Sequence, residues 1–233
     1  MQALTNAAPP QDLMRYPDPT RMEDILLGLL EDLRNTMING SDDVPVLDPL
    51  ELEHVEIHGE DIDIPGLTLT LTDFVLKYLS TFEVHSLHVT NVLLIRYTIN
   101  FDGSIPLLEA DAREYDLDLN IDGLSVFGKG EASIQVIKPR VTGRIEAAVR
   151  VIGGLTLEIT NCDIVFHLEG IKPKIRGLFG NEAASDFANV FLENLVPDLV
   201  TTFESDISAF LNELIPEIAN EILADLDLSG IFG

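Results

Sequence analysis

The sequence predicts an α+β protein in which a long C-terminal helix is wrapped by a strongly curved antiparallel sheet, preceded by an amphipathic N-terminal helix. Apolar residues recur at helical spacing near both ends of the chain and at every second position in between. The expected strands are also too long for a flat sheet, so they must twist and curl around something. We expect residues 1–17, rich in Pro and polar residues, to be a flexible arm and residues 18–233 to form a single domain.

The first helix is predicted from an apolar stripe behind a capping box formed by Thr20 and Glu23, with Gly40 at its end. The stripe consists of Met22, Ile25, Leu26, Leu29, Leu30, Leu33 and Met37. The opposite face is acidic, whereas helices that lie on membranes favour Lys and Arg. We therefore expect this helix to close one end of a tubular body.

The central part of the chain, residues 44–179, alternates between apolar and polar residues as a half-buried antiparallel sheet does. Apolar residues that share one parity from His85 to Phe101 predict a single strand of about 55 Å at roughly 3.3 Å per residue. A change of parity at Asn161 predicts a β-bulge. Turns are expected at the glycine-containing positions 102–103, 122–123, 128–130 and 153–154.

The C-terminal third is predicted to be helical. Ser185 or Asp186 is expected to cap a helix that runs through Phe191, and Pro197 is expected to restart it. From position 198 to 226 a broad apolar stripe continues past Pro216, which should kink the helix rather than end it. A stripe this wide favours burial against the concave side of a sheet.

The charge balance excludes several classes of partner. The 233 residues include 40 Asp and Glu against 14 Lys and Arg, a formal net charge of −26. Such a surface repels nucleic acid and anionic lipid, and no segment has the length and apolarity of a transmembrane helix. The oligomeric state stays open. Cys162 is the one cysteine, which excludes an intrachain disulfide, and we expect it to be a small buried apolar residue.

No catalytic or metal-binding pattern stands out, so we expect no enzyme, no metal and no required cofactor. The chain has no G-x-S-x-G motif. His54, Glu56 and His58 share a strand face and could chelate a metal loosely, but a solvated surface is the simpler interpretation. The carboxylates at positions 114, 116, 118 and 122 are likewise expected to be a solvated strand face.

The cellular location is open from the residues alone. The first residues do not form a signal peptide as written, so the chain is either cytoplasmic or a mature secreted form. A glycosylation sequon, Asn39-Gly40-Ser41, gives weak support to secretion.

Four segments, in order along the chain, resemble the takeout and juvenile-hormone-binding proteins of insects. Residues 44–50 (VPVLDPL) resemble the P-x-L-D-P-L that follows their first helix, and residues 166–179 (FHLEGIKPKIRGLF) resemble their late strand and turn. Residues 187–194 (FANVFLEN) are similar to N-x-F-L-N-E-N, and residues 213–218 (ELIPEI) match E-L-x-P-x-I. The N-terminal cysteine pair usual in the family is absent, and Leu195 replaces an aromatic residue.

The resemblance implies membership of the TULIP superfamily of tubular lipid-binding proteins. It implies a secreted haemolymph carrier that holds a small elongated hydrophobic molecule in an internal tunnel: a terpenoid like juvenile hormone, a fatty acyl lipid or a carotenoid-type pigment. The alternative is a protein-interaction or innate-immune module that acts through its surface without a bound ligand. If the tunnel exists, the apolar strand and helix residues are its expected lining. They are Leu93, Ile95, Tyr97, Ile99, Phe101, Tyr115, Leu117, Leu119, Phe127, Phe166, Phe191, Phe203, Ile207, Phe210 and Leu214.

Overall fold

The computed structural model describes residues 19–41, 44–61, 64–93, 95–121, 123–150 and 156–224. The expected arm at 1–17 and the expected turn at 153–154 lie outside these ranges. Helix α1 (Pro19–Asn39) comes first, and α2 (Glu182–Thr202) and α3 (Glu204–Ala224) come last. The strands between them are β1 (Leu50–His58), β2 (Leu67–Lys77), β3 (Glu83–Leu93), β4 (Arg96–Ser104), β5 (Leu107–Ile121), β6 (Leu124–Ile137), β7 (Arg140–Arg150), β8 (Thr156–His167) and β9 (Gly170–Ile175). Two short 3-10 helices, η1 (Gly59–Asp61) and η2 (Leu79–Thr81), lie in connections.

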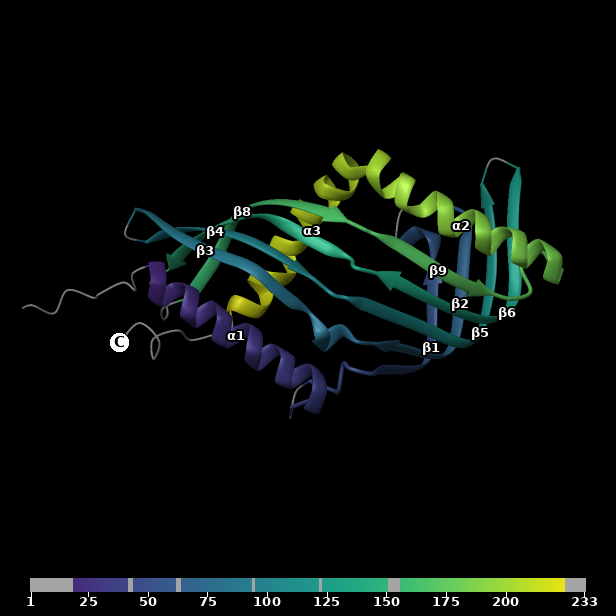
Figure 1. Ribbon diagram of the computed structural model, residues 1–233, viewed down its shortest axis with the longest axis horizontal. Coiled ribbons are helices and arrows are strands. Elements are labelled where there is room, and N and C mark those ends of the chain that lie inside the picture. Colours follow the sequence, from purple (N-terminus) through teal and green to yellow (C-terminus); the bar gives the residue numbers. More distant parts are fainter. Residues whose placement is uncertain are drawn as a thin grey trace, which may run out of the picture.

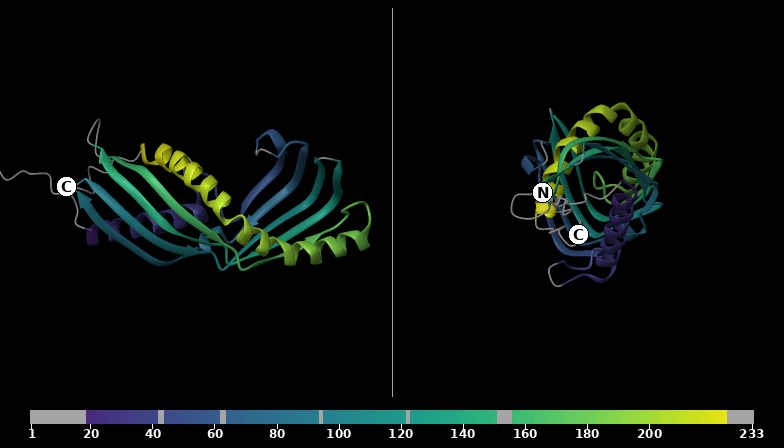
Figure 2. Two further views of the ribbon diagram at one scale, coloured as in Figure 1. Left: turned by 90° about the horizontal axis from the view of Figure 1, so that it is seen from above. Right: turned by 90° about the vertical axis from the view of Figure 1, so that its left-hand side faces the viewer.

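The strands form two antiparallel sheets that lie end to end in an elongated body (Figure 1). The five-stranded sheet has the order β1-β2-β5-β6-β9, and the four-stranded sheet has the order β3-β4-β7-β8. Seen along the long axis, strands and helices are arranged around a common centre (Figure 2). The expected class, a curved antiparallel sheet with C-terminal helices and an N-terminal helix, is therefore confirmed.

The chain passes from one sheet to the other through short connections between strands, and we call the region where these connections lie the waist. The breaks after β4 and β6 contain Pro106 and Pro139, which have no backbone N–H to give to a sheet ladder. Neighbouring connections remain hydrogen-bonded, since the Ile105 N–H donates to the Pro139 carbonyl at 3.0 Å and the Lys138 N–H donates to the Pro106 carbonyl at 3.2 Å. Hydrogen bonding between neighbouring segments therefore continues across the waist, although the sheet ladders end on either side of it.

The single strand expected from His85 to Phe101 is wrong, because this segment is the hairpin of β3 and β4. Leu87 pairs with Phe101 and Val89 pairs with Ile99. Paired residues share a face, so the apolar parity continues through the hairpin tip and the sequence alternates as one strand would.

Two expected turns are also wrong, and the expected bulge is confirmed. Positions 102–103 lie within β4 and positions 128–130 within β6. Strands β5 and β6 do form a hairpin, in which Ile121 pairs with Leu124, and position 122 of the expected turn lies outside the described residues. In β8 the register shifts so that Glu146 pairs with Asn161 and Ala147 with Ile159, which leaves Thr160 as the extra residue of the bulge.

The helix boundaries differ from those expected. Thr20 lies inside α1, so it is not its N-cap. Asn181, rather than Ser185 or Asp186, caps α2, and its side chain accepts hydrogen bonds from the backbone N–H groups of residues 183 and 184. Pro197 and Pro216 lie inside α2 and α3, and the expected continuous helix breaks at Phe203. Because α2 packs on β9 and α3 packs on β8, the break coincides with the step between the two sheets.

Candidate functional site

Each sheet has one apolar face, defined by the strand register. In the four-stranded sheet Val89, Ile99, Ile145 and Cys162 are successive partners across the strands and share this face. In the five-stranded sheet Ile57, Leu69 and Leu117 are likewise successive partners. The opposite face of the five-stranded sheet carries charged residues such as Asp116 and Lys129, which are paired in the register.

The expected lining residues of the four-stranded sheet differ in exposure. Tyr97 and Ile99 are buried, with 1% and 7% of their surfaces exposed. Phe101 and Phe166 are half-buried, while Ile95 at the hairpin tip is 41% exposed. Leu93 ends β3, and its side chain lies outside the described part of the structure.

In the five-stranded sheet the register brings together three of the four expected lining residues. Tyr115 is buried and Leu117 and Leu119 are half-buried on the same face. Phe127 instead pairs with Asp118, so it lies on the charged face, where its ring contacts Phe179 edge to face at 5.8 Å. Our placement of Phe127 on the apolar face was therefore wrong.

The expected lining residues of the C-terminal helices are more exposed than those of the strands. Phe191, Phe203 and Phe210 have 51%, 50% and 63% of their surfaces exposed, while Ile207 and Leu214 are half-buried. The Phe191 ring stacks on that of Phe187 at 6.2 Å, and all three phenylalanines still leave large apolar surfaces open. The lining as a whole stays a prediction.

Tyr115, one of the expected lining residues, brings a hydroxyl group to the apolar face of the five-stranded sheet. It donates a hydrogen bond to the carbonyl of Arg176 at 2.8 Å. Burial, and then the charge of Asp116, raises the pKa of Tyr115, so the hydroxyl keeps its proton at neutral pH. The hydroxyl therefore cannot donate a hydrogen bond to a ligand while it donates to Arg176, although its oxygen can still accept one.

Sequence reasoning missed three asparagines that attach the C-terminal helices to the sheet edges. Asn189 of α2 accepts from the Ile175 N–H at 2.9 Å and donates to the Ile175 carbonyl at 3.0 Å. Asn220 of α3 makes the same pair of bonds with Ile159, at 2.7 and 3.0 Å. Asn212 accepts from the Ile164 N–H at 2.7 Å. The signal was present as polar residues on the otherwise apolar sides of the predicted helix.

The bulge at Thr160 makes two of these bonds possible together. Backbone N–H groups along a strand alternate in direction, so residues five apart, such as Ile159 and Ile164, normally point to opposite sides. The extra residue changes the parity between them, and both N–H groups then point outward to α3. At Ile159, Ile164 and Ile175 the edges of β8 and β9 therefore bond to side-chain amides rather than to further strands.

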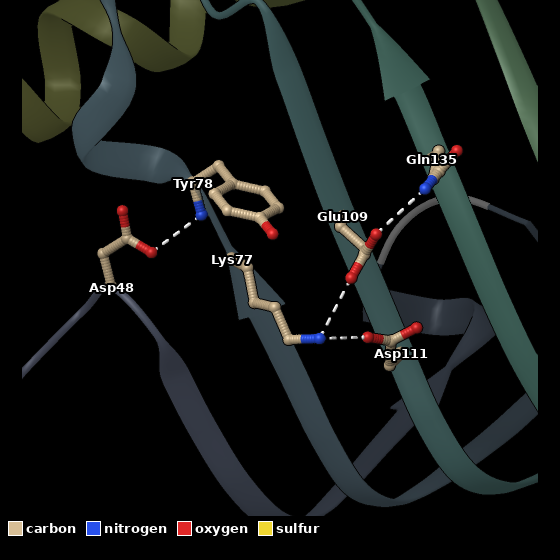
Figure 3. A network of polar contacts seen from close by, with 6 residues as sticks. All are labelled: Asp48, Lys77, Tyr78, Glu109, Asp111 and Gln135. Carbon is tan, nitrogen blue, oxygen red and sulfur yellow. Dashed lines mark hydrogen bonds and ion pairs between the residues drawn. The ribbon is translucent and has the colours of Figure 1, made fainter.

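A polar network lies on the charged face of the five-stranded sheet near the waist (Figure 3). The Lys77 ammonium donates to Glu109 at 3.0 Å and to Asp111 at 2.7 Å, and Gln135 donates to Glu109 at 3.0 Å. Hydrogen bonds from Gln135 and Lys77 lower the pKa of Glu109. Burial alone would raise the pKa of Asp111, but hydrogen bonds from Lys77 and Ser133 outweigh it and the pKa is lowered.

Beside this network Asp48 secures the connection from β2 to β3. Its carboxylate accepts from the backbone N–H group of Tyr78 at 2.7 Å (Figure 3). It also accepts from the backbone N–H group of Ser80 at 2.9 Å. These bonds, with the Ser80 hydroxyl, hold the pKa of Asp48 below its usual value although burial acts in the opposite direction. The role of both networks is to fix the waist, and neither faces an apolar site.

Helix α1 is attached along the edge strand β3. The Glu23 carboxylate accepts from the Val89 N–H at 2.7 Å and lies 3.0 Å from Nδ1 of His88. Arg34 donates to the carbonyls of Ser80 and Phe82 at 3.0 and 2.8 Å, and its guanidinium lies 4.4 Å from the centre of the Phe82 ring. This helix therefore covers the β3 edge, as α3 covers the β8 edge.

Three features were of interest for metal binding, thiol chemistry and membrane insertion among the described residues. Within the described ranges no three His, Cys, Asp or Glu side chains gather closely enough to hold a metal ion. Cys162 is buried on the apolar face as expected, and burial raises the pKa of its thiol. Across the same ranges no helix has the length and apolarity needed to cross a membrane.

Comparison with solved structures gives the fold. The crystal structure of Takeout 1 from Epiphyas postvittana superposes with a TM-score of 0.58 at 18% identity, covering 93% of this chain and 96% of that one. The crystal structure of lipopolysaccharide binding protein gives 0.32 at 12% identity, covering 86% of this chain and 41% of that one. No curated protein matches the sequence. The family model described as haemolymph juvenile hormone binding protein matches residues 3–233. The chain belongs to the haemolymph juvenile hormone binding protein family.

Proposed function

We propose that the protein is a carrier that holds one small elongated hydrophobic molecule between its sheets and its C-terminal helices. The candidate ligands are a terpenoid of the juvenile hormone type, a fatty acyl lipid or a carotenoid-type pigment. The family, named for hormone binding in haemolymph, supports both the carrier role and a secreted location. A binding protein rather than an enzyme fits the residues described above.

The observation that carries the proposal is the number of large apolar side chains left open by the fold. Phe191, Phe203 and Phe210 are at least half exposed, and Leu117 and Leu119 are only half-buried. A protein that filled its interior with its own side chains would bury such residues. Covering them with a ligand would contribute about 25 cal/mol per Å² of apolar surface, before the cost of ordering the ligand.

Native ligand analysis tests the proposal. Protein purified without detergent is extracted with organic solvent, and the extract is analysed by mass spectrometry and absorbance. We expect one apolar compound in stoichiometric amount, and visible bands would identify a polyene pigment. The delipidated protein should then bind the uncharged fluorophore N-phenyl-1-naphthylamine at one site. An empty extract together with no binding of this probe would refute the carrier role and favour the surface-acting alternative.

A further inference from the structure

We infer that the ligand lies against the five-stranded sheet and α2, and that the four-stranded half is closed by its own packed core. This inference rests on the proposed carrier function and refines it, since the expected lining was spread over both halves. It is drawn from the difference in burial between the two apolar faces.

The four-stranded half is filled. Its apolar face contains a set of side chains that are each less than 10% exposed: Val89, Tyr97, Ile99, Ala147, Val149, Leu157, Cys162 and Ile164. Most of these form one cluster, which also includes Met22 of α1, and Leu223 of α3 packs against it. Side chains from the helices on both edges of this sheet therefore help to close its apolar face, where Phe101 and Phe166 remain half-buried.

The five-stranded half is not filled. Among the described residues of its apolar face, Ala112, Tyr115 and Pro173 are buried, while the longer aliphatic and aromatic side chains remain partly open. The open set includes Leu52, Ile57, Leu69, Leu71, Phe74, Leu117, Leu119, Ile134 and Val136. Helix α2 covers the β9 edge, whereas α1 and α3 pack on strands of the other sheet. The β1 edge is thus without a helix within the described part of the chain.

The chemistry of this face selects the ligand. The register places charged residues such as Asp111, Asp116 and Lys129 on the opposite face, and the apolar side chains named above are the ones that the described part of this face presents to a headgroup. The Tyr115 hydroxyl already donates its hydrogen bond to the Arg176 carbonyl. An ionised fatty acid held wholly inside would lose its hydration without gaining a counter-ion. The site therefore suits an uncharged chain such as a terpenoid ester, an alkyl chain or a polyene.

The absence of tryptophan from the chain allows a direct test. Leu117→Trp places a single reporter on the apolar face of the five-stranded half, and Tyr97→Trp places one in the packed cluster. Phe101→Trp, a half-buried aromatic position of the four-stranded sheet, is the second control in case Tyr97→Trp does not fold. The full-length delipidated variants are titrated with 1-bromododecane, an uncharged alkyl chain whose bromine quenches indole fluorescence on contact.

We expect saturable quenching of at least twofold in Leu117→Trp and less than a tenth of the signal lost in the controls. Equal or stronger quenching in Tyr97→Trp or Phe101→Trp would overturn the placement while leaving the carrier function intact. Absence of saturable binding of both 1-bromododecane and N-phenyl-1-naphthylamine to the unmodified protein would instead remove the carrier function, and the placement with it. The three results are therefore distinguishable.

Discussion

Single residues fix the close approach of the segment after β9 to strand β6. Gly177 has φ +74°, and a Cβ on it would lie 2.0 Å from the Lys129 carbonyl oxygen. Gly123 has φ +87° with nothing within 4 Å of its Cβ position. Both glycines have a positive φ, but only at Gly177 would a side chain also clash with neighbouring backbone. Comparing the two positions therefore separates the cost of backbone strain from the cost of the clash.

We predict that Gly177→Ala destabilises the protein more than Gly123→Ala does. Placing alanine at positive φ costs about 1 kcal/mol at either position. The clash at Gly177 is with backbone and cannot be relieved by a side-chain rotation, so the total loss should exceed about 2 kcal/mol. Urea unfolding followed by circular dichroism measures both values, and equal losses would show that the contact with Lys129 is not tight in solution.

The Lys77 network predicts a pH-dependent contribution to stability. Lys77 has a raised pKa, through hydrogen bonds to Asp111 and then Glu109, and both carboxylates have lowered pKa values. Groups with lowered folded-state pKa values stabilise the fold above their unfolded pKa values, and this is lost as pH falls through the folded ones. The ammonium contributes at every pH below its own unfolded pKa, so acid acts through the carboxylates.

Lys77→Met should therefore lower stability at pH 7, and the difference from the unmodified protein should shrink below about pH 4, where Asp and Glu protonate. Thermal unfolding from pH 3 to pH 8 measures this difference. Arg113→Met is the matched control, since its pair with Asp73 is more exposed and should contribute less. A difference that is constant with pH would mean that Lys77 acts through packing of its alkyl chain.

Elements are joined here by side-chain amides at sheet edges. Asn220→Ala should leave the Ile159 N–H and carbonyl without their partners and cost about 1–3 kcal/mol. Asn194→Ala is the control on the other C-terminal helix, because Asn194 donates only to the Val190 carbonyl of its own helix and is exposed. Hydrogen exchange of the Ile159 amide should quicken in Asn220→Ala and stay unchanged in Asn194→Ala; unchanged exchange in both would contradict the attachment.

The order and type of elements were predictable, but their ends were not. Alternation predicts the sheet correctly, but it does not distinguish one long strand from a tight hairpin whose paired residues share a parity, as in β3 and β4. Glycines at 128 and 130 indicated a turn, whereas they lie in β6, where a Cβ would collide with the residues 176–178 that pass beside it. Such approaches between distant segments leave no periodic signal in the sequence.

The sequence predicts most of the residues on the apolar face of the five-stranded sheet, but not which half of the molecule is filled by its own side chains. The apolar parity correctly placed Tyr115, Leu117 and Leu119 on one face, but Phe127 follows the opposite parity across the hairpin. Which half of the elongated body packs shut depends on the cluster that includes Met22 of α1 and against which Leu223 of α3 packs. This cluster gathers residues from the two ends of the described chain, so local spacing could not anticipate it.

For the whole molecule, net charge rather than ion pairing should govern the response to salt. The formal charge of −26 produces repulsion throughout the surface. Most described ion pairs are half exposed, such as Arg144–Glu146 and Lys138–Glu169, and each such pair contributes about 0–1 kcal/mol. Salt screens both effects, but the many unpaired carboxylates make repulsion the larger one.

We therefore predict that raising NaCl from low ionic strength to about 0.5 M, where the screening length falls below about 5 Å, increases the melting temperature. A gain of about 1–2 kcal/mol would appear as a rise of several degrees in a chain of this size. Differential scanning calorimetry measures the shift, and a matched series in sucrose separates screening from general solute exclusion. A fall in melting temperature would show that the exposed ion pairs, and not the excess of carboxylates, dominate the electrostatic free energy of the folded state.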